Sequence, residues 1–121
     1  MIIIKRIIIS LILILLSYHS FSCDYPAPPK NLPDGATSDK DQMLLGVNKI
    51  ALYQENMSAY LACIEKNEIE AMKSLNNIDE NEKNLRKELF NKKYIAAIET
   101  QIKTVEMFNV EIREFKAKLK K

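Results

Sequence analysis

Two cysteines and one histidine are the side chains of this 121-residue sequence best suited to covalent or metal chemistry. Cys23 and Cys63 could be joined in a disulfide, and His19 could act as the base of a Ser-His or Cys-His pair or as a metal ligand. Each of these uses depends on whether the residue belongs to the mature protein. The chemistry must therefore be judged together with the segments that carry these residues.

The first 22 residues have the layout of a bacterial secretory signal peptide. A basic pair is followed by an apolar run over 7–16 and a polar stretch, with Ser20 and Ser22 at the −3 and −1 positions of a cut before Cys23. A permanent membrane helix needs about 20 apolar residues, so this run is too short to persist as an anchor. We predict that residues 1–22 are removed, which leaves no integral membrane segment; an uncleaved N-terminal anchor is the alternative.

Cleavage before Cys23 changes both the charge and the chemistry of the chain. Lys5 and Arg6 are two of its 18 basic side chains, so 16 basic side chains remain to balance 16 acidic ones. A neutral chain lacks the basic excess of a nucleic-acid-binding protein. Cleavage also removes His19, the only histidine, and with it any Ser-His or Cys-His pair and any imidazole ligand.

The remaining groups that could do chemistry are carboxylates and hydroxyls. Glu65 and Glu68, like the run Asp79, Glu80 and Glu82, stand where a solvated helix face and a turn are expected, without the burial that perturbs a carboxyl pKa. The run also lacks the spacing and the glycine of an EF-hand. The serines have no base and no glycine-rich loop nearby. We therefore predict a protein that is not an enzyme and has no catalytic residue, metal site or cofactor.

We expect Cys23 and Cys63 to form a disulfide, because an exported protein with two cysteines normally oxidises them. Chain lengths agree with this pairing. An extended arm over 23–38 covers about 46 Å and a helix over 38–63 covers about 37 Å, so the arm can fold back and reach Cys63. Closing this loop would stabilise the fold by about 3–4 kcal/mol. The alternative is lipidation of Cys23 as the first residue of a lipoprotein, although Ser20 stands where a lipobox usually has an aliphatic residue.

Residues 23–37 form a proline-rich arm in front of a helical domain over 38–121. All four prolines of the chain lie in the arm, which predicts an extended strip. The strip ends in the turn sequence Pro33-Asp34-Gly35, in which proline presets φ and glycine is free to take a positive φ. Ser38 then opens an S-x-x-D capping box with Asp41, which predicts the start of a helix.

Two long segments without proline predict helices over 39–75 and 79–119. Apolar residues recur every seven positions in each segment; these are Met43, Ile50, Met57, Ile64 and Ala71 in the first and Ile98, Val105, Ile112 and Leu119 in the second. Asn77 with Glu80, or Asp79 with Glu82, could cap the second helix. The short connection predicts an all-α fold, an antiparallel hairpin of long, coiled-coil-like helices.

The register of this hairpin follows from a turn near Asn77, which places positions summing to about 154 opposite each other. Met43 then faces Ile112, Ile50 faces Val105, Met57 faces the region of Ala97 and Ile98, and Ile64 faces Phe90, so apolar residues meet throughout. The turn-proximal ends, 65–73 and 79–87, are largely polar. We expect them to form a thin, solvated tip.

Two helices bury only one stripe each, so the core needs a further layer. The first helix carries a second track through Gly46, Tyr53 and Tyr60 on the face that an arm held by Cys63 would cross. We predict that the arm packs there, with its prolines on the two tyrosines and Gly46 allowing close approach. The alternatives are half-exposed surface tyrosines and completion of the core by dimerisation into a four-helix bundle.

These residues carry a resemblance to a family of small exported bacterial proteins of unknown function. The shared pattern is a signal segment, a cysteine, a proline-rich strip, the block Pro33-Asp34-Gly35-Ala36-Thr37, the block Tyr60-Leu61-Ala62-Cys63 and a last helix with Phe108-Asn109 and Phe115. The resemblance covers nearly all of the mature chain. It implies export and the pairing of Cys23 with Cys63. Because the family has no assigned activity, the resemblance transfers no catalytic or binding residue to this sequence.

The sequence favours an exported, non-enzymatic binding module of the periplasm or extracellular space that contacts a protein partner whose identity is unknown. The alternative is a structural protein of the cell envelope, either self-associating as a homodimer or tethered by a lipid on Cys23. A monomer with a well-covered core would favour the first interpretation. An obligate dimer or an acylated Cys23 would favour the second.

Overall fold

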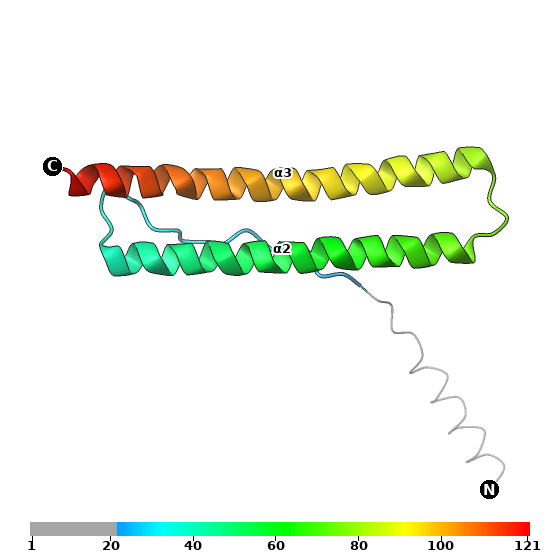
Figure 1. The fold of residues 1–121 in the computed structure, drawn as a ribbon, viewed down its shortest axis with the longest axis horizontal. Helices are drawn as coiled ribbons and strands as arrows, with labels where there is room; N and C mark the ends of the chain where they lie inside the picture. The colour runs from blue at the N-terminus through cyan, green and yellow to red at the C-terminus, as the bar shows by residue number, and fades with distance from the viewer. Residues whose placement is uncertain (1–21) are drawn as a thin grey trace, which may run out of the picture.

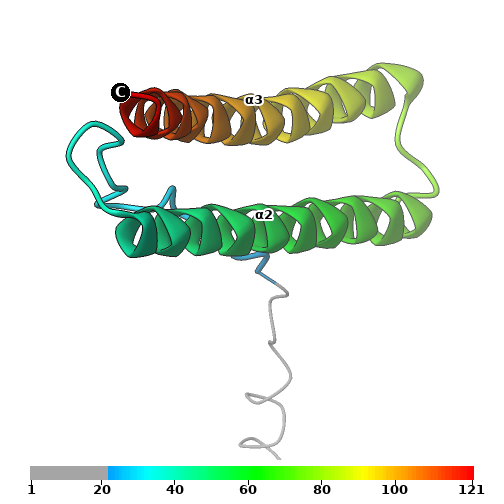
Figure 2. The same ribbon diagram turned by 60° about the vertical axis from the view of Figure 1, so that its left-hand side comes forward.

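The computed structural model describes residues 22–121, which form two long antiparallel helices and an extended arm (Figure 1). The helices are α2 (Lys40–Ser74) and α3 (Glu80–Leu119), and no strand occurs in the described part. The arm runs alongside α2, and its turn lies at the end of the rod where α3 finishes (Figures 1 and 2). The predicted all-α hairpin with an arm packed on its first helix is confirmed. The predicted signal segment over 1–22 falls almost entirely on residues outside the described range.

The first helix begins one residue later than predicted, because Asp39 rather than Ser38 is its N-cap. The Asp39 side chain accepts a hydrogen bond from the Gln42 backbone N–H at 2.8 Å, and the Gln42 side chain accepts one from the Asp39 backbone N–H at 2.9 Å. The predicted Ser38 and Asp41 box is therefore wrong. The Ser38 backbone N–H instead donates to the Asp34 carbonyl at 2.9 Å, which closes the preceding turn.

Asp79 caps the second helix, which settles the two alternatives left by the sequence. Its carboxylate accepts a hydrogen bond from the Glu82 backbone N–H at 2.9 Å. Acidic residues also occupy the first turn and lysines the last turn, where each complements the helix dipole. The cap and the charges at its two ends thus favour the observed limits of α3 without any long-range contact.

The core consists of two clusters that agree with the predicted register. One joins Tyr53, Met57, Tyr60, Ile64 and Ala97, with Phe90 and Tyr94 packed against it. The other joins Met43, Ile50 and Phe108, with Val105, Ile112 and Phe115 packed against it. Met57 and Phe108 are the two largest side chains that are fully buried among the described residues. The two clusters therefore agree with the register that the turn near Asn77 and the heptad stripes predicted together.

The arm contacts both helices, whereas the sequence predicted contact with the first helix only. Leu32 packs against the cluster around Phe108. The Gly35 backbone N–H donates to the Glu111 carboxylate at 2.8 Å, and the Lys118 ammonium donates to the Ser38 carbonyl. The turn of the arm is thus held on α3. It bridges the open end of the hairpin, opposite the connection between the helices.

Gly35 is needed for a close approach and not for the positive φ that its turn sequence predicted. Within residues 22–121 no glycine has a positive φ, and Asn31 takes the left-handed conformation at φ 55°. A Cβ on Gly35 would collide with the backbone carbonyl of Glu111 and would lie 2.9 Å from the Phe115 nitrogen. The Asp34 side chain shapes the turn by accepting from the Ala36 backbone N–H at 2.7 Å.

The tip near the connection is polar, as the sequence predicted. Most of its side chains are exposed, and its main cross-helix contact is the ion pair of Arg86 with Glu68, in which the guanidinium donates twice, at 2.7 and 3.0 Å. Over residues 22–121, neither helix has a stretch sufficiently long and apolar to cross a membrane. The apolar packing is therefore concentrated between the two helices and under the arm.

Candidate functional site

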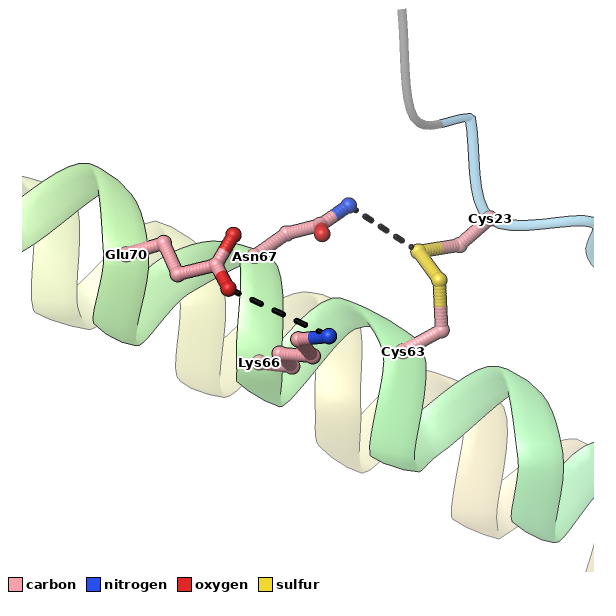
Figure 3. The surroundings of a disulfide bond; sticks show 5 residues. All are labelled: Cys23, Cys63, Lys66, Asn67 and Glu70. Carbon is pink, nitrogen blue, oxygen red and sulfur yellow. Dashed lines mark hydrogen bonds and ion pairs between the residues drawn. A yellow bond between two sulfur atoms is a disulfide. The ribbon is translucent and has the colours of Figure 1, made fainter.

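The Cys23–Cys63 disulfide anchors the start of the arm to α2 (Figure 3). The two Cα atoms lie 5.8 Å apart, within the normal range for a disulfide, and the predicted pairing is confirmed. The Asn67 side-chain amide points toward this bond and donates to the Cys23 sulfur at 3.2 Å. Both sulfurs are consumed by the bond, so in this state neither is a thiolate nucleophile.

The arm continues from the disulfide onto Tyr60, one of the two predicted tyrosines. Tyr25 meets Tyr60 edge to face, with ring centroids 5.0 Å apart and an interplanar angle of 84°. Tyr53 and Tyr60 are buried, with 3% and 6% of their surface exposed. Tyr25 was missing from the predicted contacts, which named only prolines, although its place two residues after Cys23 could have indicated it.

Gly46 lies where the arm, α2 and α3 meet. A Cβ at this position would lie 2.6 Å from the ring carbon Cζ of Phe108 and 2.7 Å from the Pro33 ring. The close approach predicted for the arm is therefore matched by an equally close approach of α3. Lys49, one turn later, donates to the carbonyls of Lys30 and Asn31 at 3.3 Å and holds the strip above this junction.

A groove runs along α2 beside the arm. One stretch of about 470 Å³ is lined on the arm side by Asn31, Pro33 and Ser38. On the helix side Leu45 and Leu52 line it together with Gly46 and the polar residues Gln42, Asn48 and Lys49. These two leucines are 63% and 57% exposed. The walls are fixed by the disulfide, the proline ring and the Lys49 contacts, so the groove is a preformed surface with an apolar floor.

Three of the five acidic residues singled out in the sequence have structural partners in the fold. Glu68 pairs with Arg86, Asp79 caps α3, and Glu80 lies 3.8 Å from Lys83. The structure does not gather Glu65 and Glu68 with the run that begins at Asp79 into one group of ligands among the described residues.

One carboxylate group that the sequence did not predict occurs at the docking point of the turn. Oxygens of Asp34, Glu111 and Glu114 lie within 4.8 Å of one another. Asp34 and Glu111 use this position to accept hydrogen bonds from backbone N–H groups of the turn. Sequence positions 34 and 111 have no local signal that relates them. The group is explained by the attachment of the turn to α3.

The outward face of α3 is dominated by charged residues that pair along the helix. Arg113 donates to Glu106 at 2.8 Å, and this hydrogen bond, together with one from Asn109, holds the pKa of the Glu106 carboxyl below its ordinary value. The Lys92 ammonium, 2.8 Å from Glu88, likewise lowers the pKa of that carboxyl. These ion pairs are solvated, and among them Ile95, Ile102 and Met107 are also more than half exposed.

The candidate site is thus the groove and the exposed surface along α2 and the arm. It combines the predicted residues Cys23, Cys63, Tyr60 and Gly46, which contact or hold the arm, with exposed leucines that sequence reasoning did not single out. Tyr53 lies in the buried cluster between the helices. A scan against protein-family models and searches of curated proteins and solved structures found no match to this chain.

Proposed function

We propose that this chain is a small exported binding module that works through protein–protein contact and carries out no reaction itself. The observation that carries the proposal is the preformed groove beside the arm, with Leu45 and Leu52 largely exposed on its floor. Leu45 and Leu52 stand one above the other beside the arm, so a partner in the groove could cover both at once. They contribute binding energy when a partner covers them.

Export is supported by the disulfide together with the predicted signal segment. Disulfides of this kind persist in the periplasm and outside the cell and are rare in the reducing cytosol. Cys23 would be the first residue of the mature chain, and its sulfur is joined to Cys63, which leaves no thiol for a lipid thioether. The resemblance to small exported bacterial proteins supports the same location.

The proposal that the chain carries out no reaction is supported by its lack of a mature histidine and by the structural roles of its carboxylates. No histidine occurs after residue 19. Glu68, Asp79 and Glu111 are engaged in an ion pair, a helix cap and a turn contact. A balanced mature charge also favours a protein partner over a nucleic acid.

Export is tested by the unreduced intact mass of the protein recovered from the cell that makes it. We expect the mass of residues 23–121 less two hydrogens, which would establish the cleavage site and the disulfide together. A mass raised by acyl chains would instead support the second candidate function, a lipid-tethered spacer of the cell envelope. The length of α3, 40 residues or about 60 Å, is the observation that favours this alternative.

Binding is tested by photo-crosslinking from the groove in the exporting cell. A photoreactive residue at Leu52 should give adducts of defined mass. The matched control at Leu89, an equally exposed leucine on α3, should give none. If neither position gives a defined adduct, the module has no partner at this surface and the proposed function is wrong.

A further inference from the structure

The outward side of α2 carries a continuous seam that no described segment covers. We define the α2 outer stripe as Leu45, Asn48, Leu52, Glu55, Ala59 and Ala62, all exposed. Successive members are alternately three and four positions apart, which is the spacing of a coiled-coil seam. Apart from the first residues of the arm, no described segment lies on the side of α2 away from α3 (Figures 1 and 2).

The stripe differs from the outward face of α3 in its charge content. Between residues 41 and 62, three of fourteen exposed residues are charged, and one of these, Lys49, is turned to the arm. Over an equal length of α3, residues 92–113, six of eleven exposed residues are charged. A low charge content is typical of a surface that is covered by another protein.

We propose that the α2 outer stripe is a homodimer interface, on which α2 of a second copy packs antiparallel. This inference rests on the proposed function, because it names the partner of the surface described above. The dimer is a reversible one formed from folded monomers, not the obligate dimer of the structural alternative. The two hairpins would then form a four-helix assembly with an α2 pair at its centre. The stripe of each copy would then be covered by the same stripe of the other copy.

The antiparallel direction follows from the distribution of large and small residues. The leucines lie in the first half of the stripe and the alanines in the second half. An antiparallel pair places Leu45 opposite Ala62 and Asn48 opposite Ala59, so at both ends of the stripe a large side chain faces a small one. At its centre Leu52 lies opposite Glu55, whose carboxylate can extend to the solvated edge of the seam. A parallel pair would stack leucine on leucine and Glu55 on Glu55.

Charge at the ends of the stripe supports the same direction. The seam spacing continues to Asp41 at one end and Lys66 at the other. Both residues are exposed. Within its own chain, the Lys66 ammonium pairs with the Glu70 carboxylate at 4.0 Å. In the antiparallel register Asp41 of each copy faces Lys66 of the other, whereas a parallel register would oppose like charges at both ends.

The arm completes the interface on one side. The groove beside Leu45 and Leu52 has Pro33 in its opposite wall, and a second hollow lies between Ala59 and the arm at Cys23 and Pro26. A helix placed on the stripe would therefore contact α2 and the arm together. This arrangement makes the anchored arm part of the binding surface.

The test is sedimentation equilibrium of the oxidised mature chain, residues 23–121, over a wide concentration range. We expect a monomer–dimer equilibrium, and Leu52→Glu should raise the dimer dissociation constant by roughly 100-fold, because it places two charges in the seam. Leu89→Glu is the matched control, since Leu89 is equally exposed, at 57%, on α3. Circular dichroism of both variants checks that the helices remain.

Charge exchange tests the direction of the pair. Asp41→Lys alone, or Lys66→Asp alone, should weaken the dimer by about tenfold at low salt. The double variant should restore it, because the attraction between the two ends is re-formed with the signs exchanged. Failure of the double variant to restore dimerisation would overturn the antiparallel arrangement.

A chain that stays monomeric at the highest concentration, or a dimer unaffected by Leu52→Glu, would overturn the inference. The proposed function would still stand if crosslinking from Leu52 in the cell gave a defined adduct of a different protein. It would fall with the inference if no adduct formed. The two failures are therefore distinguishable.

Discussion

Gly46 shows how a single residue can set the distance between three segments. In an open helix, replacing glycine by alanine stabilises by about 1 kcal/mol. At this position the added methyl would lie 2.6 Å from Phe108 and 2.7 Å from Pro33, which come from opposite sides. Overpacking of this kind costs about 1–3 kcal/mol and outweighs the gain in helix propensity.

We therefore predict that Gly46→Ala destabilises the oxidised protein by up to about 2 kcal/mol in urea unfolding. Ser58→Ala, an exposed substitution in the same helix, is the control and should change stability by less than about 0.5 kcal/mol. Unchanged or increased stability of Gly46→Ala would show that the three segments can separate at no cost. The junction at Gly46 would then not be a packing constraint.

Tyr53 offers a test of a buried polar atom. Its hydroxyl is the one side-chain polar atom in the described part that is buried without a hydrogen-bond partner. Leaving such a group unpaired costs about 1–3 kcal/mol. We expect Tyr53→Phe to be neutral or to raise the free energy of unfolding by about 1 kcal/mol, measured by urea unfolding beside Tyr60→Phe. A clear loss of stability would mean that the hydroxyl is hydrogen-bonded in solution.

The arm is the element whose attachment the fold needs most, because the two helices alone bury one stripe each. The disulfide closes a loop with a sequence separation of 40, and loop entropy predicts a stabilisation of about 4 kcal/mol. We expect a variant with both Cys23→Ser and Cys63→Ser to show a lower thermal midpoint than the oxidised chain. Adding a reductant should lower the midpoint of the native protein toward that of the variant, and it should leave the variant unchanged.

If reduction left the midpoint of the native protein where it was, the arm would contribute nothing to the core. Packing of Tyr25 on Tyr60 and of Pro33 on Gly46 would then be incidental contacts. The comparison with the serine variant separates this outcome from incomplete reduction.

The elements that follow from periodicity were predictable from the sequence. The stripes through Met57 and Ile98 repeat every seven residues, and a helix can bury such a stripe only against another, so both the helices and their register follow. The start of α2 was predicted one residue too early. Ser38 and Asp39 are both good caps, and the choice depends on the Asp34 turn, which uses the Ser38 backbone.

Contacts between distant segments could not be predicted in the same way. Gly35 donates to Glu111 across 76 positions and Lys118 donates to Ser38 across 80. No spacing rule relates such residues, and Gly35 had a simpler explanation as a turn residue. The exposed leucines of the groove were overlooked for a related reason, because a sequence shows heptad stripes without showing which of them the arm and α3 will cover.

The number of packed layers changes along the length of the molecule. Near the start of α2 and the end of α3, the arm adds a third layer that contacts both helices. Near the connection, only two helices are present, and their contact is mainly the Glu68–Arg86 ion pair, whose side chains are 22% and 38% exposed. A solvated ion pair contributes little to stability. Local stability should therefore decrease from the arm end to the tip.

Hydrogen exchange of the oxidised chain, followed by mass spectrometry, would measure this gradient directly. Amides of the tip, over 66–74 and 80–87, should exchange about tenfold to a hundredfold faster than those around Met57 and Phe108, because opening the tip exposes few buried apolar side chains. Reduction of the disulfide should accelerate exchange around Gly46 and Phe108 more than in the tip, since the arm packs between both helices there, whereas it meets the tip at the Asn67 contact with the Cys23 sulfur. Uniform protection along both helices would instead mean that the hairpin opens as one cooperative unit, with the arm distributing its stabilisation over the full length.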